Sequence, residues 1–261
     1  MMILSCLLKA TWPAFMLVGP HHSYHAAILG PSVNSINREV LRSVDKVQAQ
    51  APRGGGYFTG VRAIPAESPI GFSLRLKGEE LLRPPRSTSY CSGSTYAVLV
   101  ETLNQLLPKT PSPQIIEELR MQEPDGSRRE DEVKAWGWWN ADGFGCDYAL
   151  VQYLGLGTRV KLAEAIPGDF MNISWKSGNG HSVVFLGWIR HPSQPPAILV
   201  WSSQKGTNGY GDLMAPLSSI REISTVRLTD PLKLLTLQPG VVDRKAAVGE
   251  SPERVTLPGD R

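Results

Sequence analysis

The Asn179-Gly180 dipeptide joins two stretches of strand-like sequence and constrains the fold more than any other feature. Asn-Gly favours the tight two-residue turn of a β-hairpin, because both residues tolerate positive φ. Residues 170–175 alternate in polarity before it, and residues 181–189 provide an apolar return strand. Two more strands are predicted at 197–201 and 220–228. The second half of the chain is therefore expected to form an antiparallel meander.

Helical patterns dominate the first half of the chain. Apolar residues recur at helical spacing after Cys91, and Pro108 ends the run. Ser112-Pro113 predicts a second helix start, since serine suits the N-cap and proline the first helical position. A further helical stretch spans residues 36–48. Helices followed by strands indicate an α+β fold in which the Cys91 helix packs on an antiparallel β-sheet.

Three segments are expected along the chain. Residues 1–52 mix apolar patches with turn formers and are interpreted as a leader or irregular N-terminal segment. The glycines after Arg53 mark a boundary, and residues 53–237 are expected to form one domain. Residues 238–261 are charged, rich in proline and glycine and without periodicity, so we expect disorder there. On this interpretation, truncation after Leu237 leaves the stability of the domain unchanged.

The composition narrows the class of protein. Of 261 residues, 41% are hydrophobic and 20% charged, which is typical of a globular chain. The net charge of +3 and the lack of a basic cluster interleaved with aromatics argue against a nucleic-acid partner. Lys9, Pro13 and Pro20 interrupt the apolar N-terminus, so no integral membrane segment is expected. The same segment is a poor secretion signal, which leaves the localisation open.

Cys91 is the strongest candidate for a chemical role. It lies in a polar, turn-like approach to a helix, between Tyr90 and Ser92. A helix N-terminus stabilises the thiolate form, which is the nucleophilic form of cysteine. The chain has three cysteines, too few and odd in number for a disulfide framework, and Cys146 is interpreted as a core thiol.

His181 is the candidate partner of Cys91. It begins the return strand of the predicted hairpin, where its ring can reach a neighbouring element. An imidazole beside a thiol can take the thiol proton, and this pair is the core of thiol-dependent acyl transfer. The cluster formed by His21, His22 and His25 lacks carboxylate or cysteine partners at ligand spacing, so neither a metal site nor a cofactor is expected.

Three short motifs then resemble, in sequence order, the NlpC-type papain-like cysteine peptidases and amidases. They are Cys91-Ser92-Gly93, Pro167-Gly168-Asp169 and Gly180-His181-Ser182. The resemblance covers about residues 88–204, with an insertion between the cysteine and the histidine. It implies a papain-like core, with Cys91 as nucleophile and His181 as general base. Many members of this family cut bacterial cell-wall peptides.

Two departures from that family concern the site. The family usually has aspartate before the nucleophile, whereas this chain has Tyr90. The third polar residue of the family falls near Ser203, Gln204 and Asn208. An amide oxygen can orient an imidazole, as asparagine does in papain-like triads. Gln204 is the favoured third residue and Asn208 the second choice, with Ser203 also open.

The oxyanion and substrate-binding side of the site has three candidates. The backbone N–H of Cys91 is one expected oxyanion donor, and the resemblance suggests Tyr57 as the second, because related enzymes place a tyrosine near the cysteine. Ser92 and Trp138 are assigned to the same side. The tryptophans at 136, 138 and 139 have two interpretations, as a stacking wall for substrate or as core packing, and packing is the more common role of such residues.

The leading functional hypothesis is a thiol hydrolase that cleaves an amide bond in a peptide or peptidoglycan-like substrate. An acyltransferase would use the same pair, with an amine or alcohol in place of water. A non-catalytic module that binds glycan or peptide through its tryptophans is the third interpretation. A cell-wall substrate would require a location outside the cytoplasm. The sequence assigns no oligomeric state.

Overall fold

The computed structural model describes residues 24–50, 56–58, 70–82, 89–121, 134–191, 194–246 and 253–255. The main helices are α1 (Tyr24–Leu29), α2 (Ser35–Ala49), α3 (Cys91–Leu106), α4 (Pro113–Leu119), α5 (Lys134–Asn140) and the π-helix η3 (Asp147–Tyr153). The strands are β1 (Leu74–Leu76), β2 (Glu79–Leu82), β3 (Gly157–Val160), β4 (Phe170–Trp175), β5 (Gly180–His191), β6 (Gln194–Gln204), β7 (Gly209–Pro216), β8 (Ile220–Leu228) and β9 (Glu253–Arg254). Short 3-10 turns include η5 (Lys205–Thr207), η6 (Leu217–Ser219) and η7 (Pro231–Thr236).

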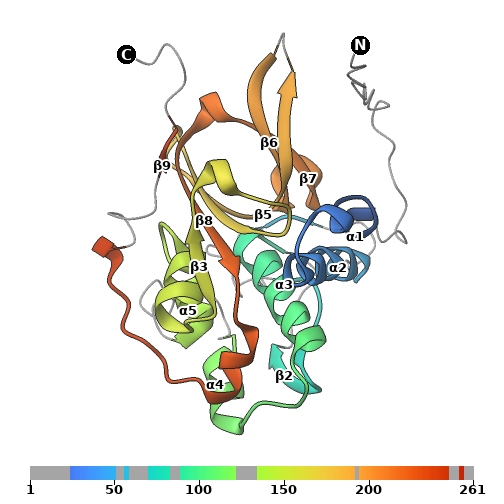
Figure 1. The fold of residues 1–261 in the computed structure, drawn as a ribbon, viewed down its shortest axis with the longest axis vertical. Coiled ribbons are helices and arrows are strands. Elements are labelled where there is room, and N and C mark those ends of the chain that lie inside the picture. Colours follow the sequence, from blue (N-terminus) through green and yellow to red (C-terminus); the bar gives the residue numbers. More distant parts are fainter. Residues whose placement is uncertain are drawn as a thin grey trace, which may run out of the picture.

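The expected combination of helices with an antiparallel sheet is confirmed. The large sheet has the order β3-β8-β4-β5-β6-β7, with β9 paired to β8, and every one of its pairings is antiparallel. The strands are not a simple meander, however. Strand β8 enters between β3 and β4, although it follows both of them in the sequence. Figure 1 shows this sheet above the helices.

The hairpin between β4 and β5 forms, but its turn differs from the prediction. Gly180 already belongs to β5, and the turn instead spans residues 176–179, with Gly178 at φ 96°. The backbone N–H of Trp175 donates to the carbonyl of Asn179, and that of Lys176 donates to the carbonyl of Ser219. The first bond closes the loop itself, whereas the second ties it to the neighbouring turn η6, an influence that the local sequence of the hairpin does not contain.

The N-terminal helices belong to the same core as the rest of the domain, which differs from the expected boundary at residue 52. Helix α2 begins after the N-cap Asn34, whose side chain accepts a hydrogen bond from the backbone N–H of Asn37. Its apolar face, made of Val40, Leu41, Val44 and Val47, is buried in the main core together with α3. Residues 1–23 lie outside the described residues.

Two apolar cores cover the two faces of the sheet. The larger one combines α2, α3 and α5 with one set of strand side chains, among them Phe170, Val184 and Trp201. The second contains the alternate residues of the same strands, such as Met171 and Val183. Apolar side chains of the central strands therefore pack on both faces of the sheet, which fixes the register because a slip of one residue would exchange the two sets.

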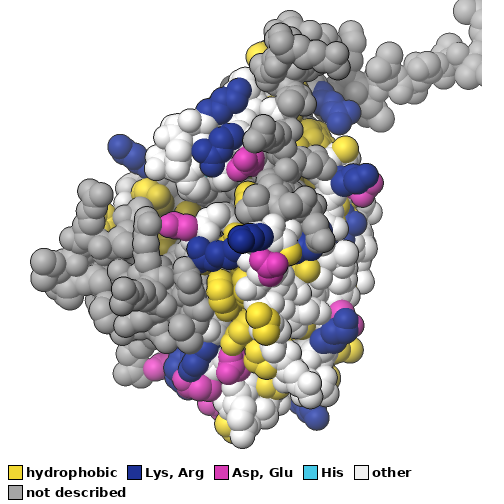
Figure 2. All heavy atoms as spheres, turned by 90° about the vertical axis from the view of Figure 1, so that its left-hand side faces the viewer, with side chains coloured by type: hydrophobic (Ala, Val, Ile, Leu, Met, Phe, Trp, Pro, Cys, Tyr) yellow, Lys and Arg dark blue, Asp and Glu magenta, His cyan; other side chains and the backbone are white. Residues whose placement is uncertain are grey.

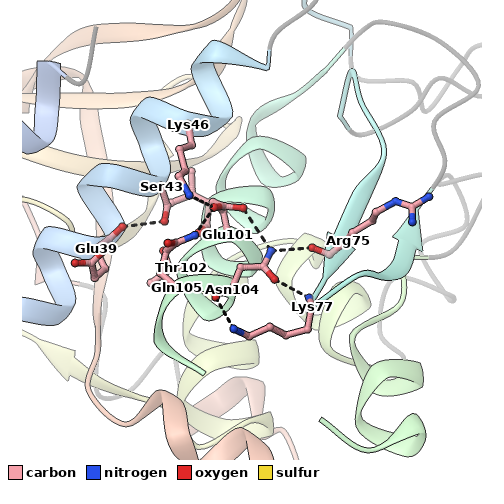
Figure 3. A network of polar contacts seen from close by, with 10 residues as sticks. Glu39, Ser43, Lys46, Arg75, Lys77, Glu101, Thr102, Asn104 and Gln105 are labelled. Atoms are coloured by element: carbon pink, nitrogen blue, oxygen red, sulfur yellow. Dashed lines mark hydrogen bonds and ion pairs between the residues drawn. The ribbon is translucent and has the colours of Figure 1, made fainter. Parts of the chain in front are cut away.

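A polar network holds the β1–β2 hairpin against α3 (Figure 3). The side chain of Asn104 accepts a hydrogen bond from the backbone N–H of Lys77 at 2.7 Å and donates to the carbonyl of Arg75 at 2.9 Å. On the next turn of α3, Glu101 pairs with Lys46 of α2 at 2.8 Å. Helix α3 is therefore fixed from two sides.

An ion cluster centred on the buried His25 joins α1 to α2 and to β7. The ring of His25 contacts Asp45 through Nδ1 at 2.7 Å and Asp212 through Nε2 at 3.0 Å. Burial alone would lower the pKa of His25, but the hydrogen bonds and charges of the two carboxylates raise it from 6.5 to about 9. His25 is therefore a cation at neutral pH.

The C-terminal segment contacts the domain at several points, although the sequence predicts disorder from residue 238 onward. The backbone N–H of Gly240 donates to the carbonyl of Tyr153 at 2.8 Å, and the guanidinium of Arg244 lies 5.7 Å from the ring centre of Trp138. Strand β9 pairs with β8 through Glu222 and Ile223. A periodicity analysis cannot predict these contacts, because each depends on a single residue and not on a repeating apolar face.

The ion cluster at His25 makes stability depend on pH. A histidine whose pKa is higher in the folded state stabilises that state fully below the unfolded pKa of about 6.5, and this contribution is lost as the pH rises through about 9. His25→Gln should therefore be less stable than the wild type at pH 6, by at most on the order of 3 kcal/mol. The difference should shrink above pH 9, as urea unfolding at both pH values can measure. An equal difference at both would contradict the ionic origin.

Truncation tests the C-terminal contacts. Removal of residues 238–261 eliminates the bond to Tyr153, the stacking of Arg244 and the pairing of β9, so we expect a lower melting temperature. Lost exposed contacts of this kind usually cost about 1–2 kcal/mol. Thermal unfolding of the full chain and the truncated chain is the measurement. Identical melting temperatures would restore the expectation that this segment is disordered.

Candidate active site

Cys91 is the first residue of α3, a helix of 16 residues. The preceding Tyr90 is extended, and its side chain makes no cap hydrogen bond, so the first turn of α3 presents its backbone N–H groups without a side-chain cap. These groups carry the positive end of the helix dipole. Cys91 as a residue is partly exposed, while its thiol interacts with groups of the protein interior.

Buried hydroxyl groups hold the N-terminus of α3 against β5 and β6. Thr95 Oγ1 and Ser182 Oγ are 2.7 Å apart, and Ser94 Oγ accepts a hydrogen bond from the backbone N–H of Ser203 at 3.0 Å. Ser202 Oγ donates to the carbonyl of Ser182 at 2.7 Å. All five groups are buried. They fix the helix end that carries Cys91 relative to the strand that carries His181.

The structure brings Cys91 and His181 together. The imidazole of His181 and the backbone N–H groups of Ser92 and Ser182 lie close enough to the Cys91 sulfur to interact with it. Burial alone would raise the pKa of the Cys91 thiol, but the bond and charge of His181 and the two N–H groups lower it. For His181, burial lowers the pKa, and contact with Cys91 and with Gln204 raises it above its ordinary value. The pair favours thiolate and imidazolium.

Gln204 is the residue that orients His181. Gln204 is the last residue of β6, and its Oε1 lies 3.1 Å from Nε2 of His181, near the start of β5. Its Nε2 donates to the carbonyl of Gly211 at 2.8 Å, which fixes which end of the amide faces the ring. An amide oxygen can only accept, so His181 Nε2 carries a proton. Nδ1 is then the nitrogen that can take the thiol proton.

Asn208 and Ser203, the other candidates for the third position, lie elsewhere. Asn208 has a left-handed conformation after η5, with φ 48°, and its Oδ1 accepts a hydrogen bond from the backbone N–H of Tyr57 at 3.4 Å. Ser203 Oγ pairs with Ser89 Oγ at 2.7 Å. Asn208 therefore supports the segment that carries Tyr57, and Ser203 supports the segment before Cys91.

Tyr57 lies near the thiol. Its backbone forms a parallel bridge with Ser89, two residues before Cys91. Burial raises the pKa of the Tyr57 phenol, and the charge of Cys91 adds to the rise. A neutral phenol beside the nucleophile can donate a hydrogen bond, which is what an oxyanion donor must do.

Ser92 and Trp138 have roles that differ from each other. Ser92 lies beside the thiol, with its hydroxyl bonded to Asn140 and its carbonyl accepting from the indole N–H of Trp139 at 3.1 Å. Trp138 packs edge-on against Tyr148, with ring centres 6.1 Å apart. No described contact links Trp138 to Cys91. The tryptophans of this run serve mainly as packing, with Trp136 and Trp139 fully buried.

Trp175 is a site residue that the sequence analysis missed. Its ring lies 6.3 Å from that of His181, at an interplanar angle of 31°, and it is only partly buried. Ile173 pairs with His181 in the β4–β5 ladder, and Trp175, two residues further along β4, lies on the same face. The signal in the sequence was the alternation along this strand, but it could be used only once the pairing of Ile173 with His181 was known.

The Pro-Gly-Asp motif has a structural role. The buried carboxylate of Asp169 accepts hydrogen bonds from Asn37 Nδ2 at 2.9 Å and from Arg227, and the motif thus joins α2, β4 and β8. Gly168 has φ 93°, and a Cβ there would come within 2.7 Å of the carbonyl oxygen of Asn37. Only glycine suits both conditions.

Other candidate sites offer less chemistry. The described residues contain no group of three His, Cys, Asp or Glu side chains that could hold a metal ion. Cys146 is buried, and burial raises the pKa of its thiol well above the ordinary value, as expected for a core cysteine. A hollow of about 300 Å³ lies between α2, α3 and the β1–β2 hairpin, near the network of Figure 3, and contains none of the candidate catalytic residues.

Among the described residues, the face of the molecule shown in Figure 2 has no large patch of a single charge. Positive and negative side chains are interspersed there, with a strip of hydrophobic residues between them. Within the part of the chain that the structure describes, no helix has the length and apolar character needed to cross a membrane.

Comparisons with family models, curated proteins and solved structures found no match. The resemblance to NlpC-type enzymes therefore depends on the three short sequence motifs alone.

The two described cysteines should differ sharply in reactivity. Because the pKa of Cys91 is lowered and that of Cys146 is raised, iodoacetamide at pH 7 should modify Cys91 at least about tenfold faster than Cys146. His181→Ala should slow the reaction of Cys91 and shift its midpoint upward. Peptide mass spectrometry over a pH series measures both thiols in one sample, with Cys146 as the internal control. Equal rates would contradict the thiolate assignment.

Proposed function

We propose that the chain is a papain-like thiol hydrolase that cleaves an amide bond, with Cys91 as nucleophile and His181 as general base. The observation that carries the proposal is the contact between thiol and imidazole at the N-terminus of α3, with the ring oriented by Gln204. A buried core cysteine without a role would have its pKa raised, as Cys146 does. Cys91 has the opposite shift and an accessible position.

The first half of the reaction follows from the hydrogen bonds. His181 Nδ1 takes the proton of the Cys91 thiol, and the sulfur attacks the carbonyl carbon of the amide. The oxygen of the tetrahedral intermediate receives hydrogen bonds from the backbone N–H of Cys91 and from the Tyr57 hydroxyl. His181 then gives its proton to the leaving nitrogen. The products of this stage are the free amine and a thioester on Cys91.

Water completes the cycle. His181, now neutral, takes a proton from a water molecule as its oxygen attacks the thioester, and the thiol leaves with that proton. Throughout both stages the amide of Gln204 holds the proton of His181 Nε2, so that only Nδ1 exchanges protons with the reacting groups. Trp175 beside the ring provides an apolar wall on which a peptide or sugar can pack.

The substrate class is proposed from the family resemblance as a peptide, in particular a peptidoglycan stem peptide. An experiment with such fragments in H₂¹⁸O distinguishes the possible outcomes. A hydrolase yields a new carboxylate that contains ¹⁸O, whereas an acyltransferase yields a product joined to an added amine. Cys91→Ala is the control. Failure to find either product, together with a Cys91 peptide that never gains an acyl mass, would favour a binding module.

Gln204 provides a second test of the mechanism. Gln204→Ala removes the acceptor that holds the Nε2 proton of His181, so kcat should fall by about tenfold or more while KM changes little. Asn104→Ala, in the network between α3 and the β1–β2 hairpin, removes a comparable amide far from the thiol and should leave kcat unchanged. Steady-state kinetics on the substrate found above measures both. A normal kcat in Gln204→Ala would remove Gln204 from the mechanism.

A further inference from the structure

The ion cluster at His25 is connected to the candidate active site through the edge strand β7. His25 Nε2 contacts Asp212 at 3.0 Å, and Asp212 directly follows Gly211 in β7. The carbonyl of Gly211 accepts the hydrogen bond from Gln204 that fixes the amide, and Gln204 in turn holds His181. A continuous series of contacts therefore runs from α1 to the catalytic imidazole.

We propose that His25 is a positioning residue for the reaction, which acts through Asp212 on the Gly211 carbonyl and thereby on the orientation of Gln204 and His181. This inference depends on the proposed function, because it assigns a support to the Cys91–His181 pair. His25 itself touches no reacting atom.

The position of β7 explains why such a support is needed. Among the strands that the structure describes, β7 is the outer strand of the sheet and pairs only with β6. Backbone pairing therefore fixes it on one side alone, and the His25–Asp212 contact fixes it from another element. At Gly211 the backbone also passes close to η5, since a Cβ there would lie 2.8 Å from the side chain of Thr207. The backbone at Gly211 is therefore confined between its pairing with β6 and the side chain of Thr207.

If the Gly211 carbonyl moves away, the two ends of the Gln204 amide are no longer distinguished. With Gly211 as acceptor, the NH₂ group faces β7 and the oxygen faces His181. Without it, the amide can turn and present NH₂ to the ring. His181 Nε2 would then have to accept, and the proton would move to Nδ1. In that tautomer Nδ1 cannot take the proton of the Cys91 thiol.

The carboxylates around His25 stabilise its contact with Asp212. Asp45 of α2 accepts from His25 Nδ1 and also from the backbone N–H groups of His25 and Ala26, and the ring of Tyr24 lies edge-on at 5.4 Å. Asp212 of β7 faces the other nitrogen. The two carboxylates raise the pKa of His25 to about 9, so that a cation lies between two anions at neutral pH.

Substitutions at Asp212 test the proposal in the full chain. Asp212 is about one-third exposed on an edge strand, so its variants are expected to fold. Asp212→Ala should lower the rate of Cys91 alkylation by iodoacetamide at pH 7 about fivefold and raise the midpoint of its pH profile. Asp212→Glu keeps the carboxylate and should restore most of the rate. Arg159→Gln, which breaks the ion pair with buried Asp147 far from the thiol, is the control for general destabilisation.

The outcomes separate this inference from the proposed function. If wild-type Cys91 shows no lowered midpoint that depends on His181, the proposed function fails. If it does, but Asp212→Ala and His25→Gln retain the wild-type pH profile, the positioning role of His25 is overturned. A shifted profile in Asp212→Ala that Arg159→Gln shares would assign the effect to stability alone and would also overturn it. A shift confined to the His25 and Asp212 variants supports it.

Discussion

The structure around the candidate site depends on the buried hydroxyl contacts between the first turn of α3 and strands β5 and β6. Small hydroxyl side chains let the helix end approach the sheet, and each buried hydroxyl finds a partner, so that the approach leaves little uncompensated polarity. Without these contacts the thiol and the imidazole would belong to two independent elements. With them, Cys91 has one fixed position relative to His181.

The hydrogen bonds around His181 have a direction as well as a position. The Gly211 carbonyl can only accept, which orients Gln204, and the Gln204 oxygen can only accept, which places the proton on His181 Nε2. The ring thus presents its basic nitrogen to the thiol. An amide can perform this task without adding a negative charge to the buried pair, in contrast to an aspartate at the same place.

The sequence predicted the parts of the site that local patterns encode. The helix that begins at Cys91 and the strand that begins beside His181 agree with the observed elements, because helix and strand spacing determine them. Gln204 is favoured by the family resemblance and by the chemistry of an amide, and its Oε1 lies 3.1 Å from His181 Nε2. The position of Trp175 and the packing of residues 24–50 and 238–246 could not be predicted in this way. They depend on strand pairing and on contacts between segments remote in the sequence.

The place of β8 in the sheet has a consequence for how the chain is made. This strand lies between β3 and β4, yet it leaves the ribosome after both of them. Until it arrives, the facing edges of β3 and β4 have no partner, and Asp169 lacks the guanidinium of Arg227. The domain therefore reaches its final topology only after β8 has been made, and until then the unpaired edges of β3 and β4 need protection from pairing with other chains.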